Sequence, residues 1–116
     1  MAKKTDINKI IEKLDKTILD RKKGDVSKSY VAKLLKEGET KIGRKICEEA
    51  SEVLIAAMTE SNKRIVSESA DLLFHLMVLL AHKKIKPAEV FVELEKRMGI
   101  SGLDEKAARA AKKKGK

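Results

Sequence analysis

The chain has 116 residues, which is enough for one small domain with a modest core and too few for two independent cores. Hydrophobic residues make up 42% and charged residues 39%, and this balance excludes an intrinsically disordered chain. The single cysteine excludes an internal disulfide and a cysteine-rich zinc site, and it favours a reducing, cytoplasmic setting.

The sequence shows neither an export signal nor a membrane span. The N-terminus, MAKKTDINKI, is charged, and the longest apolar run, Leu76–Ala81, is far shorter than the ~20 residues needed to cross a bilayer. The net charge of +9 raises the idea of nucleic-acid binding. Four of those positive charges fall in residues 110–116, which we expect to be a disordered basic tail after a single domain at residues 1–109.

The apolar spacing predicts an all-α fold, because the chain has one proline and no alternating apolar pattern of any length. About five helices are expected in an antiparallel bundle, with approximate bounds 5–23, 29–36, 39–58, 62–83 and 87–98. The segment SGLDEKAAR, at residues 101–109, adds a candidate short last helix. The third and fourth helices are joined by TESN and should form an antiparallel hairpin.

Local signals set these expected boundaries. Thr5 or Asp6 is suited to cap the first helix, and Ser61 or Asn62 to cap the fourth. Gly38 should stop the short second helix, and Pro87 suits the first turn of the fifth.

The predicted third helix carries an acidic stripe beside an apolar face. At about 100° per residue, Glu48, Glu49 and Glu52 fall in one sector of the helix. Lys45 and Lys41 lie on the same stripe, one and two turns earlier respectively. The neighbouring sector is expected to face the core, and it comprises Ile46, Cys47, Ala50, Val53, Leu54, Ala57 and Met58.

The predicted fourth helix is apolar around its whole circumference except for one narrow line. Asp71 and His75 fall within roughly 60° of Glu68, and nearly every other residue at 72–80 is apolar. A helix that is apolar all round is buried, so we expect this one at the centre of the bundle. In a hairpin, its polar line can face the acidic stripe of the preceding helix.

Facing carboxylates of this kind predict a divalent metal site. Carboxylates in a partly buried cleft repel one another, and their burial is costly unless a cation compensates. Oxygen ligands on rigid helices suit Mg²⁺ or Mn²⁺ far better than zinc. A solvated face stays open as a simpler interpretation of Glu48, Glu49 and Glu52 taken alone. Lys45–Glu49 on the third helix and Arg64–Glu68 on the fourth are possible ion pairs.

Four other side chains are expected to have structural roles. His75 should be a hydrogen-bonded supporting or core residue rather than a metal ligand, and His82 should lie at the surface. Cys47 is expected to be a small core residue. Tyr30 should anchor the short second helix through its packing and its hydroxyl.

The order of these motifs resembles a known group of enzymes. EExxE at residues 48–52 followed by ExxD at residues 68–71 is similar to the signature of the MazG-like all-α nucleotide pyrophosphohydrolases. SYVAKLLKEGETKIGRKICEEASEVLIAA, ESADLLFHLMVLL, ELEKR and SGLDEKAAR extend the resemblance, over about residues 29–109, to the phosphoribosyl-ATP pyrophosphatase family. One departure is Cys47, where the family usually has glycine; this leaves the carboxylates intact and puts only the local packing in doubt.

The resemblance implies Mg²⁺-dependent hydrolysis of phosphoribosyl-ATP to phosphoribosyl-AMP and pyrophosphate, the second step of histidine biosynthesis. It also implies a homodimer in which the partner chain completes each active site. Glu49, Glu52, Glu68 and Asp71 would hold the ion, while Glu48 would bind a second ion or orient the attacking water. The candidates for binding the substrate phosphates are Lys33, Lys41, Lys45, Arg64 and Arg109.

Two other functions are weighed against this one. A MazG-like enzyme acting on free nucleoside triphosphates would share the acidic motifs, but SYVAKLL and SGLDEKAAR argue against it. A small basic helical nucleic-acid binder would need basic stripes at phosphate spacing, and the clearest polar line here is acidic. We therefore expect a nucleotide as the ligand, with neither nucleic acid nor membrane as a partner.

Overall fold

The computed structural model describes residues 5–59, 61–98, 109, 110 and 112. Its helices are α1 (Ile7–Arg21), α2 (Tyr30–Glu37), α3 (Glu39–Thr59), α4 (Asn62–His82) and α5 (Pro87–Arg97), and none of the described residues is in a strand. The predicted all-α class is confirmed, and each helix begins and ends within two residues of its expected bounds. Most of SGLDEKAAR and of the predicted basic tail lies outside the described residues.

Local capping explains where the helices begin and end. Asp6, Ser29 and Ser61 are N-caps whose side chains each accept a hydrogen bond from the backbone N–H three residues on. Gly38 separates α2 from α3 with a φ of +91°, a conformation that favours glycine. Pro87 occupies the first turn of α5, where its missing N–H costs no hydrogen bond.

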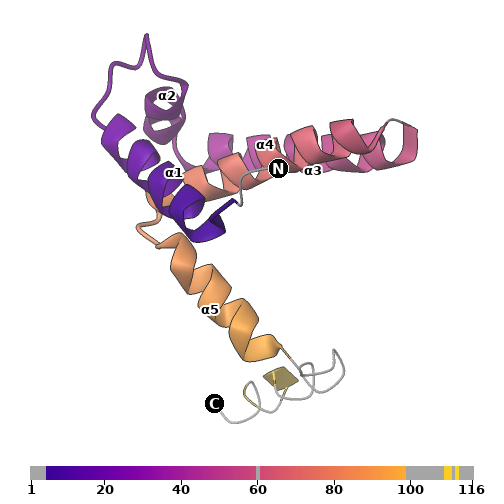
Figure 1. The fold of residues 1–116 in the computed structure, drawn as a ribbon. Helices are drawn as coiled ribbons and strands as arrows, with labels where there is room; N and C mark the ends of the chain where they lie inside the picture. Colours follow the sequence, from indigo (N-terminus) through magenta and orange to yellow (C-terminus); the bar gives the residue numbers. More distant parts are fainter. Residues whose placement is uncertain (1–4, 60, 99–108, 111, 113–116) are drawn as a thin grey trace.

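α3 and α4 form a long antiparallel hairpin, and α1 and α2 cover only one end of it (Figure 1). The buried core lies at this covered end and is built from four helices: Ile18, Val31, Leu34, Ile42, Met77, Val78 and Ala81. α5 leaves the same end of the hairpin and extends away from it (Figure 1). The core is therefore a junction of helices rather than a layer that runs the length of the hairpin.

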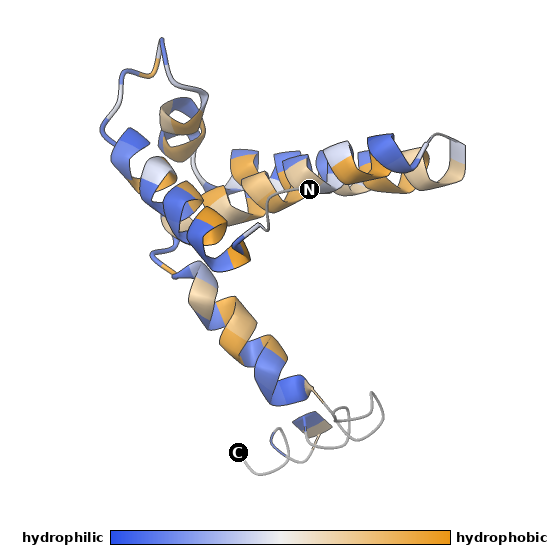
Figure 2. Ribbon diagram, in the orientation of Figure 1, coloured by the Kyte–Doolittle hydropathy of each residue, from blue (hydrophilic) through white to orange (hydrophobic). Residues whose placement is uncertain are grey.

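The outer part of the hairpin is apolar and exposed, so the expectation that α4 is buried all round was wrong. Leu54 and Met58 on α3 are 61% and 74% exposed, and Val66 and Leu73 on α4 are 69% and 58% exposed. Figure 2 shows apolar positions continuing along both arms of the hairpin, beyond the end that α1 and α2 cover. Among the described residues, the chain supplies no further helix to cover this surface.

The face of α3 that meets α4 is rotated from the predicted one. Apart from the half-buried Gly43 and Lys45, the buried and half-buried positions advance in alternating steps of four and three residues, the spacing of a seam between packed helices: Ile42, Ile46, Glu49, Val53 and Ala56. Five residues of the predicted core face are exposed instead, so the expectation that they face the core was wrong: Cys47, Ala50, Leu54, Ala57 and Met58. The cause is that α3 is apolar on two sides, and only one of them can face α4.

α4 is also long and apolar enough, by length and composition, to span a bilayer, which a count of uninterrupted apolar residues does not show. It carries Arg64, Glu68 and Asp71 within its length. The central helix of a packed bundle meets the same criterion, and α4 makes its most extensive contact with α3.

Candidate metal and nucleotide site

Three carboxylates meet across the seam between α3 and α4. Glu49 of α3 and Glu68 and Asp71 of α4 each offer one oxygen, and these oxygens lie within 4.8 Å of one another. Glu68 is buried, Glu49 is half-buried and Asp71 is exposed, so the group opens to solvent on the Asp71 side. Three convergent carboxylate oxygens fit a hard divalent cation that keeps some positions for other oxygen ligands. We call these three residues the acidic cluster.

The seam explains why these residues meet. Apart from the half-buried Ser69 and Phe74, the buried and half-buried positions of α4 at this level advance in steps of three and four residues, as on α3: Ile65, Glu68, Leu72 and His75. Glu49 and Glu68 thus occupy seam positions where packed helices usually carry aliphatic side chains. Asp71 follows Glu68 by three residues and therefore lies on the same side of α4.

Glu48 and Glu52, which the sequence places with Glu49, are exposed and lie outside the acidic cluster. At about 100° per residue, Glu48 points roughly 100° and Glu52 roughly 60° away from Glu49 around α3. Glu48 pairs with Lys45, at 3.3 Å between Oε2 and Nζ, whereas the sequence suggested Glu49 as the partner. The structure therefore brings together three of the five predicted carboxylates.

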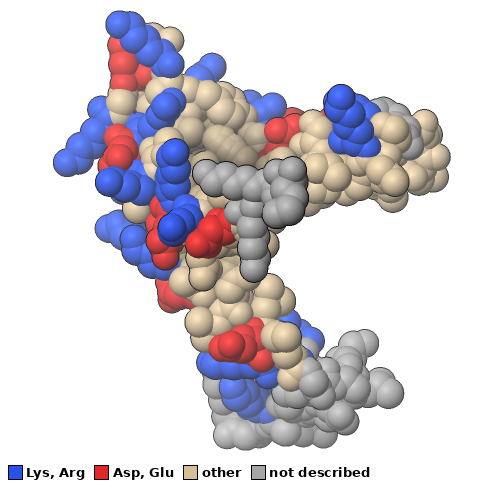
Figure 3. All heavy atoms as spheres, viewed as in Figure 1, with Lys and Arg blue, Asp and Glu red and all other residues tan. Residues whose placement is uncertain are grey.

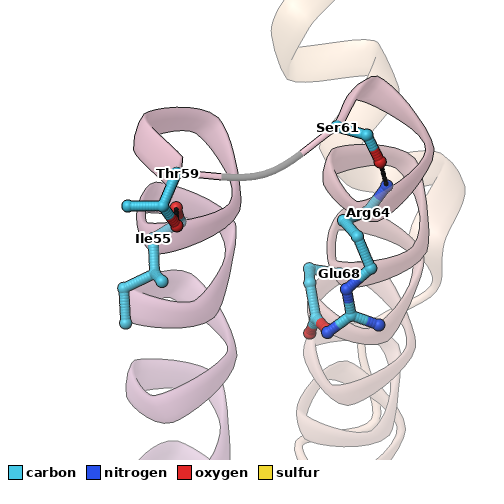
Figure 4. Close-up of polar contacts among 5 residues, drawn as sticks. All are labelled: Ile55, Thr59, Ser61, Arg64 and Glu68. Carbon is cyan, nitrogen blue, oxygen red and sulfur yellow. Dashed lines mark hydrogen bonds and ion pairs between the residues drawn. The ribbon is translucent and has the colours of Figure 1, made fainter.

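Arg64 provides the buried Glu68 with a compensating charge. Its Nη2 lies 2.5 Å from Oε1 of Glu68, one helical turn further on, and Figure 4 shows the guanidinium against the carboxylate. The backbone N–H of Arg64 is itself held by the Ser61 cap at the start of α4. The predicted Arg64–Glu68 pair is confirmed, and it offsets part of the cost of burying a carboxylate.

His75 is buried, and both of its ring nitrogens are hydrogen-bonded. Nδ1 lies 2.8 Å from the backbone carbonyl oxygen of Asp71, and Nε2 lies 2.8 Å from the hydroxyl of Tyr30. A carbonyl only accepts, so Nδ1 donates, and in the neutral ring Nε2 then accepts from Tyr30. The expected hydrogen-bonded core histidine and the anchoring hydroxyl are both confirmed. That each is the other's partner is not visible in the sequence, because 45 positions separate them.

Tyr30 lies beside the charged groups of the site. Its ring packs edge-on against His75, with the centroids 5.8 Å apart, and 48% of the residue is exposed. Burial raises the pKa of Tyr30, the charge of Lys45 opposes this shift, and Glu49 and Glu48 add to it. These electrostatic interactions place the tyrosine near both the acidic cluster and the Lys45–Glu48 pair.

The cations predicted to bind phosphate do not gather in one place. Lys45 and Arg64 contact carboxylates of the predicted set, and the hydrogen bond from Glu48 raises the pKa of Lys45. The other three are exposed: Lys33, Lys41 and Arg109. Residues 109 and 110 lie beyond the end of α5, away from the hairpin (Figure 1).

A groove in another part of the described chain has a different lining. It measures about 680 Å³ and runs between α1 and α5, where Phe91 and Val92 face side chains of α1. Asp15 lines it and pairs with Lys86, at 3.7 Å between Oδ2 and Nζ. Because its acidic side chains are not gathered as they are at the seam, we take the acidic cluster as the candidate site.

Comparison with known proteins decides the family. The family model described as phosphoribosyl-ATP pyrophosphohydrolase matches residues 11–98, which include the acidic cluster, Tyr30 and His75. The chain belongs to this family. The resemblance inferred from the sequence motifs is thereby confirmed.

Relatives of the phosphoribosyl-ATP pyrophosphohydrolase family extend the match over most of the chain. The chain is 50% identical over 101 residues to the phosphoribosyl-ATP pyrophosphatase of Novosphingobium aromaticivorans. The aligned residues cover 87% of this chain and 94% of that protein. The protein of the same name from Nitrosospira multiformis is 51% identical over 102 residues, covering 88% and 84%. That of Neisseria gonorrhoeae is 49% identical over 100 residues, covering 86% and 94%.

Proposed function

We propose that this chain hydrolyses phosphoribosyl-ATP to phosphoribosyl-AMP and pyrophosphate, the second step of histidine biosynthesis. The observation that carries the proposal is the convergence of Glu49, Glu68 and Asp71 across the seam of a chain that belongs to this family. The bond broken is the phosphoanhydride between the α and β phosphates. Its hydrolysis needs an in-line water, neutralised phosphate charge and a stabilised leaving group.

The acidic cluster would hold Mg²⁺, with Mn²⁺ as the alternative. Its donor set supports this, because Mg²⁺ takes few protein carboxylates and leaves positions for phosphate oxygens. When bound, such an ion neutralises phosphate charge and makes a water easier to deprotonate. Glu52, one turn beyond Glu49, is the fourth candidate ligand, and the exposed Glu48 would bind a second ion or orient the attacking water.

The substrate phosphates would be held by cations around the acidic cluster. Lys45 and Arg64 are placed best, because both already contact carboxylates of the site. Lys41 and Lys33 lie on neighbouring turns of α3 and on α2, where they would reach the more distant phosphates. Arg109 of the partner subunit would contribute the remaining cation.

The homodimer expected from the family resemblance fits the shape of the chain. The Cα radius of gyration is 17.2 Å, whereas a compact chain of this length has one of roughly 13 Å. Leu54, Met58, Val66 and Leu73 leave an apolar surface on the hairpin that a second hairpin of the same kind would cover. We therefore propose a soluble cytoplasmic homodimer that binds a nucleotide, without nucleic acid or membrane as a partner.

The deciding experiment is a pyrophosphate-release assay with the purified protein, with and without Mg²⁺. We expect release from phosphoribosyl-ATP that depends on Mg²⁺ and is restored by Mn²⁺ after chelation. Free ATP and deoxynucleoside triphosphates serve as the comparison panel, and we expect much slower release from them. Turnover of the panel at the rate of phosphoribosyl-ATP, or turnover unaffected by chelation, would contradict the proposal.

A further inference from the structure

A chain of hydrogen bonds leads from the acidic cluster to the protein surface. The backbone carbonyl of Asp71 accepts from Nδ1 of His75, and Nε2 of His75 meets the hydroxyl of Tyr30, each at 2.8 Å. His75, the middle link, is 7% exposed, whereas Tyr30 at the end of the chain is 48% exposed and open to solvent. The Ser29 cap holds the first turn of α2, where Tyr30 stands.

This arrangement determines what the hydroxyl of Tyr30 can bind. Its proton is donated to Nε2 of His75, so its remaining lone pairs can only accept a hydrogen bond. Phosphate oxygens are themselves acceptors and cannot use them, whereas a sugar hydroxyl can. The phenol is protonated near neutral pH, because the pKa of Tyr30 lies above the ordinary value of 10.0, so the hydroxyl can donate to His75.

We propose that Tyr30 accepts a hydrogen bond from the ribose that carries the triphosphate, and that His75 positions Tyr30 for this contact. The inference rests on the proposed function. When the phosphates lie at the acidic cluster, that ribose is the next group along the nucleotide. On the protein, the hydroxyl of Tyr30 is joined to Asp71 through the imidazole of His75. Tyr30 is thus a substrate-binding residue, and His75 acts through it.

Tyr30→Phe tests the contact directly, because it removes the oxygen and keeps the ring. We expect KM for phosphoribosyl-ATP to rise about tenfold, the loss of one hydrogen bond, while kcat changes by less than about threefold. The helix content should stay close to that of the unmodified protein, since the ring contacts with Phe74 and His75 remain. The melting temperature should fall by several degrees, because Nε2 of the buried His75 loses its partner.

A substrate analogue identifies the group that Tyr30 binds. The analogue lacks both hydroxyls of the ribose that carries the triphosphate. The unmodified protein should show a KM about tenfold higher for the analogue than for phosphoribosyl-ATP, and Tyr30→Phe should show the same KM for both. If Tyr30→Phe raises KM equally for both compounds, the hydroxyl binds another group and the proposal is wrong.

Variants of His75 test the positioning step. An asparagine amide can donate to the Asp71 carbonyl but is too short to reach Tyr30, whereas a glutamine amide can present an acceptor to Tyr30. His75→Gln should therefore retain a lower KM than His75→Asn, and adding Tyr30→Phe to His75→Asn should raise KM no further. His82→Asn, on the same helix face two turns on, is the matched control and should leave KM unchanged.

The outcomes separate this inference from the proposed function. No turnover of phosphoribosyl-ATP by the unmodified protein would refute the function itself. Normal turnover together with an unchanged KM in Tyr30→Phe would refute the role of Tyr30 alone. Additive effects of Tyr30→Phe and His75→Asn would show that His75 does not act through Tyr30.

Discussion

Single residues of the acidic cluster differ in how their charges are compensated. Glu68 is buried with Arg64 against it, whereas Asp71 is exposed and Glu49 lies half-buried in the seam. Gathering three like charges raises the free energy of the folded state unless a cation is present. Replacing a carboxylate by its amide therefore removes a ligand and relieves repulsion at the same time.

Asp71→Asn and Glu49→Gln should each lower pyrophosphate release by about a hundredfold or more, because each removes a proposed ligand from the acidic cluster. Helix content should be unchanged, and the melting temperature unchanged or higher. Terbium gives a second readout, because Tyr30 is the only tyrosine and tryptophan is absent, so ultraviolet-sensitised emission reports an ion bound near Tyr30.

Glu52→Gln is the matched variant on the adjacent, exposed face of α3. A loss as large as that of Glu49→Gln would make Glu52 the fourth ligand. A much smaller loss would confine the ion to the three residues that the seam brings together. Full activity and full terbium binding in both Asp71→Asn and Glu49→Gln would refute the site.

The sole tyrosine also gives a pH prediction. Burial raises the pKa of Tyr30 above its ordinary value of 10.0, so the folded state favours the neutral phenol. The unfolded chain then loses its proton first as the pH rises. The stability from this group is therefore present below about pH 10 and is lost as the pH rises through the folded pKa.

An ultraviolet absorbance titration follows this ionisation without interference from another tyrosine. We expect an inflection above that of the chain in denaturant. The inflection should move toward the denatured value in His75→Asn, because the acceptor of the phenol proton is gone. Identical inflections in the folded and denatured chains would contradict the effect of partial burial on the pKa of Tyr30.

Single helices show which features are encoded locally. Gly38 and Pro87 act on their immediate neighbours, and both predictions are confirmed. Asp6 and Ser61 are each one of the two caps that the sequence offered, and Ser29 caps the helix that it was expected to begin. The inward face of α3 could not be predicted, because apolar residues lie on two of its sides. Which side meets α4 depends on contacts between distant segments, and a periodicity within one helix carries no information about them.

Opposite effects on stability are expected at two glycines, one at the α2–α3 junction and one within α3. Gly38 has a φ of +91°, in a region almost confined to glycine, so Gly38→Ala should destabilise the fold by roughly 1–3 kcal/mol. Gly43 lies within α3, and a Cβ there would meet nothing within 4 Å. Gly43→Ala should therefore stabilise the fold by roughly 0.5–1 kcal/mol.

Urea unfolding followed by circular dichroism measures both changes, and each variant is the control for the other. Equal destabilisation of the two would show that the conformation of Gly38 is not the cause. A loss of stability in Gly43→Ala alone would reveal that a second chain packs against this turn of α3.

The molecule is extended, and its charged side chains are spread unevenly over the surface. Figure 3 shows charged side chains gathered over α1 and the loop after it, while much of the hairpin in the same view is uncharged. The exposed large apolar residues of the hairpin include Leu54, Met58, Val66 and Leu73. Large apolar side chains that are exposed together in this way indicate an interaction site.

Leu73→Glu should convert the proposed dimer into a monomer at micromolar concentration, because it places a charge on the apolar face of the hairpin. Size-exclusion chromatography with light scattering measures the mass of each species. Lys23→Glu, a charge change on the loop before α2, is the control and should leave the mass unchanged. An unmodified protein that runs as a monomer would disprove the dimer.

The site was predictable only as far as local spacing reaches. The acidic motifs at 48–52 and 68–71 indicate the two helices that carry the carboxylates. They do not show that Glu49 faces the seam while Glu48 and Glu52 turn outward, since that depends on how α3 is rotated against α4. Tyr30 and His75 are 45 positions apart in the sequence, and no short sequence pattern predicts that they are in contact.

The polar residues of the hairpin seam set a limit for protein engineering. Replacing Glu49, Glu68 and His75 by leucine would make the seam aliphatic along this part of its length and raise the melting temperature of the hairpin. Such a chain would lose the groups on which its proposed chemistry depends. Stabilising substitutions should therefore begin at sites such as Gly43. Libraries selected only for thermal stability should become enriched in seam variants that have lost activity.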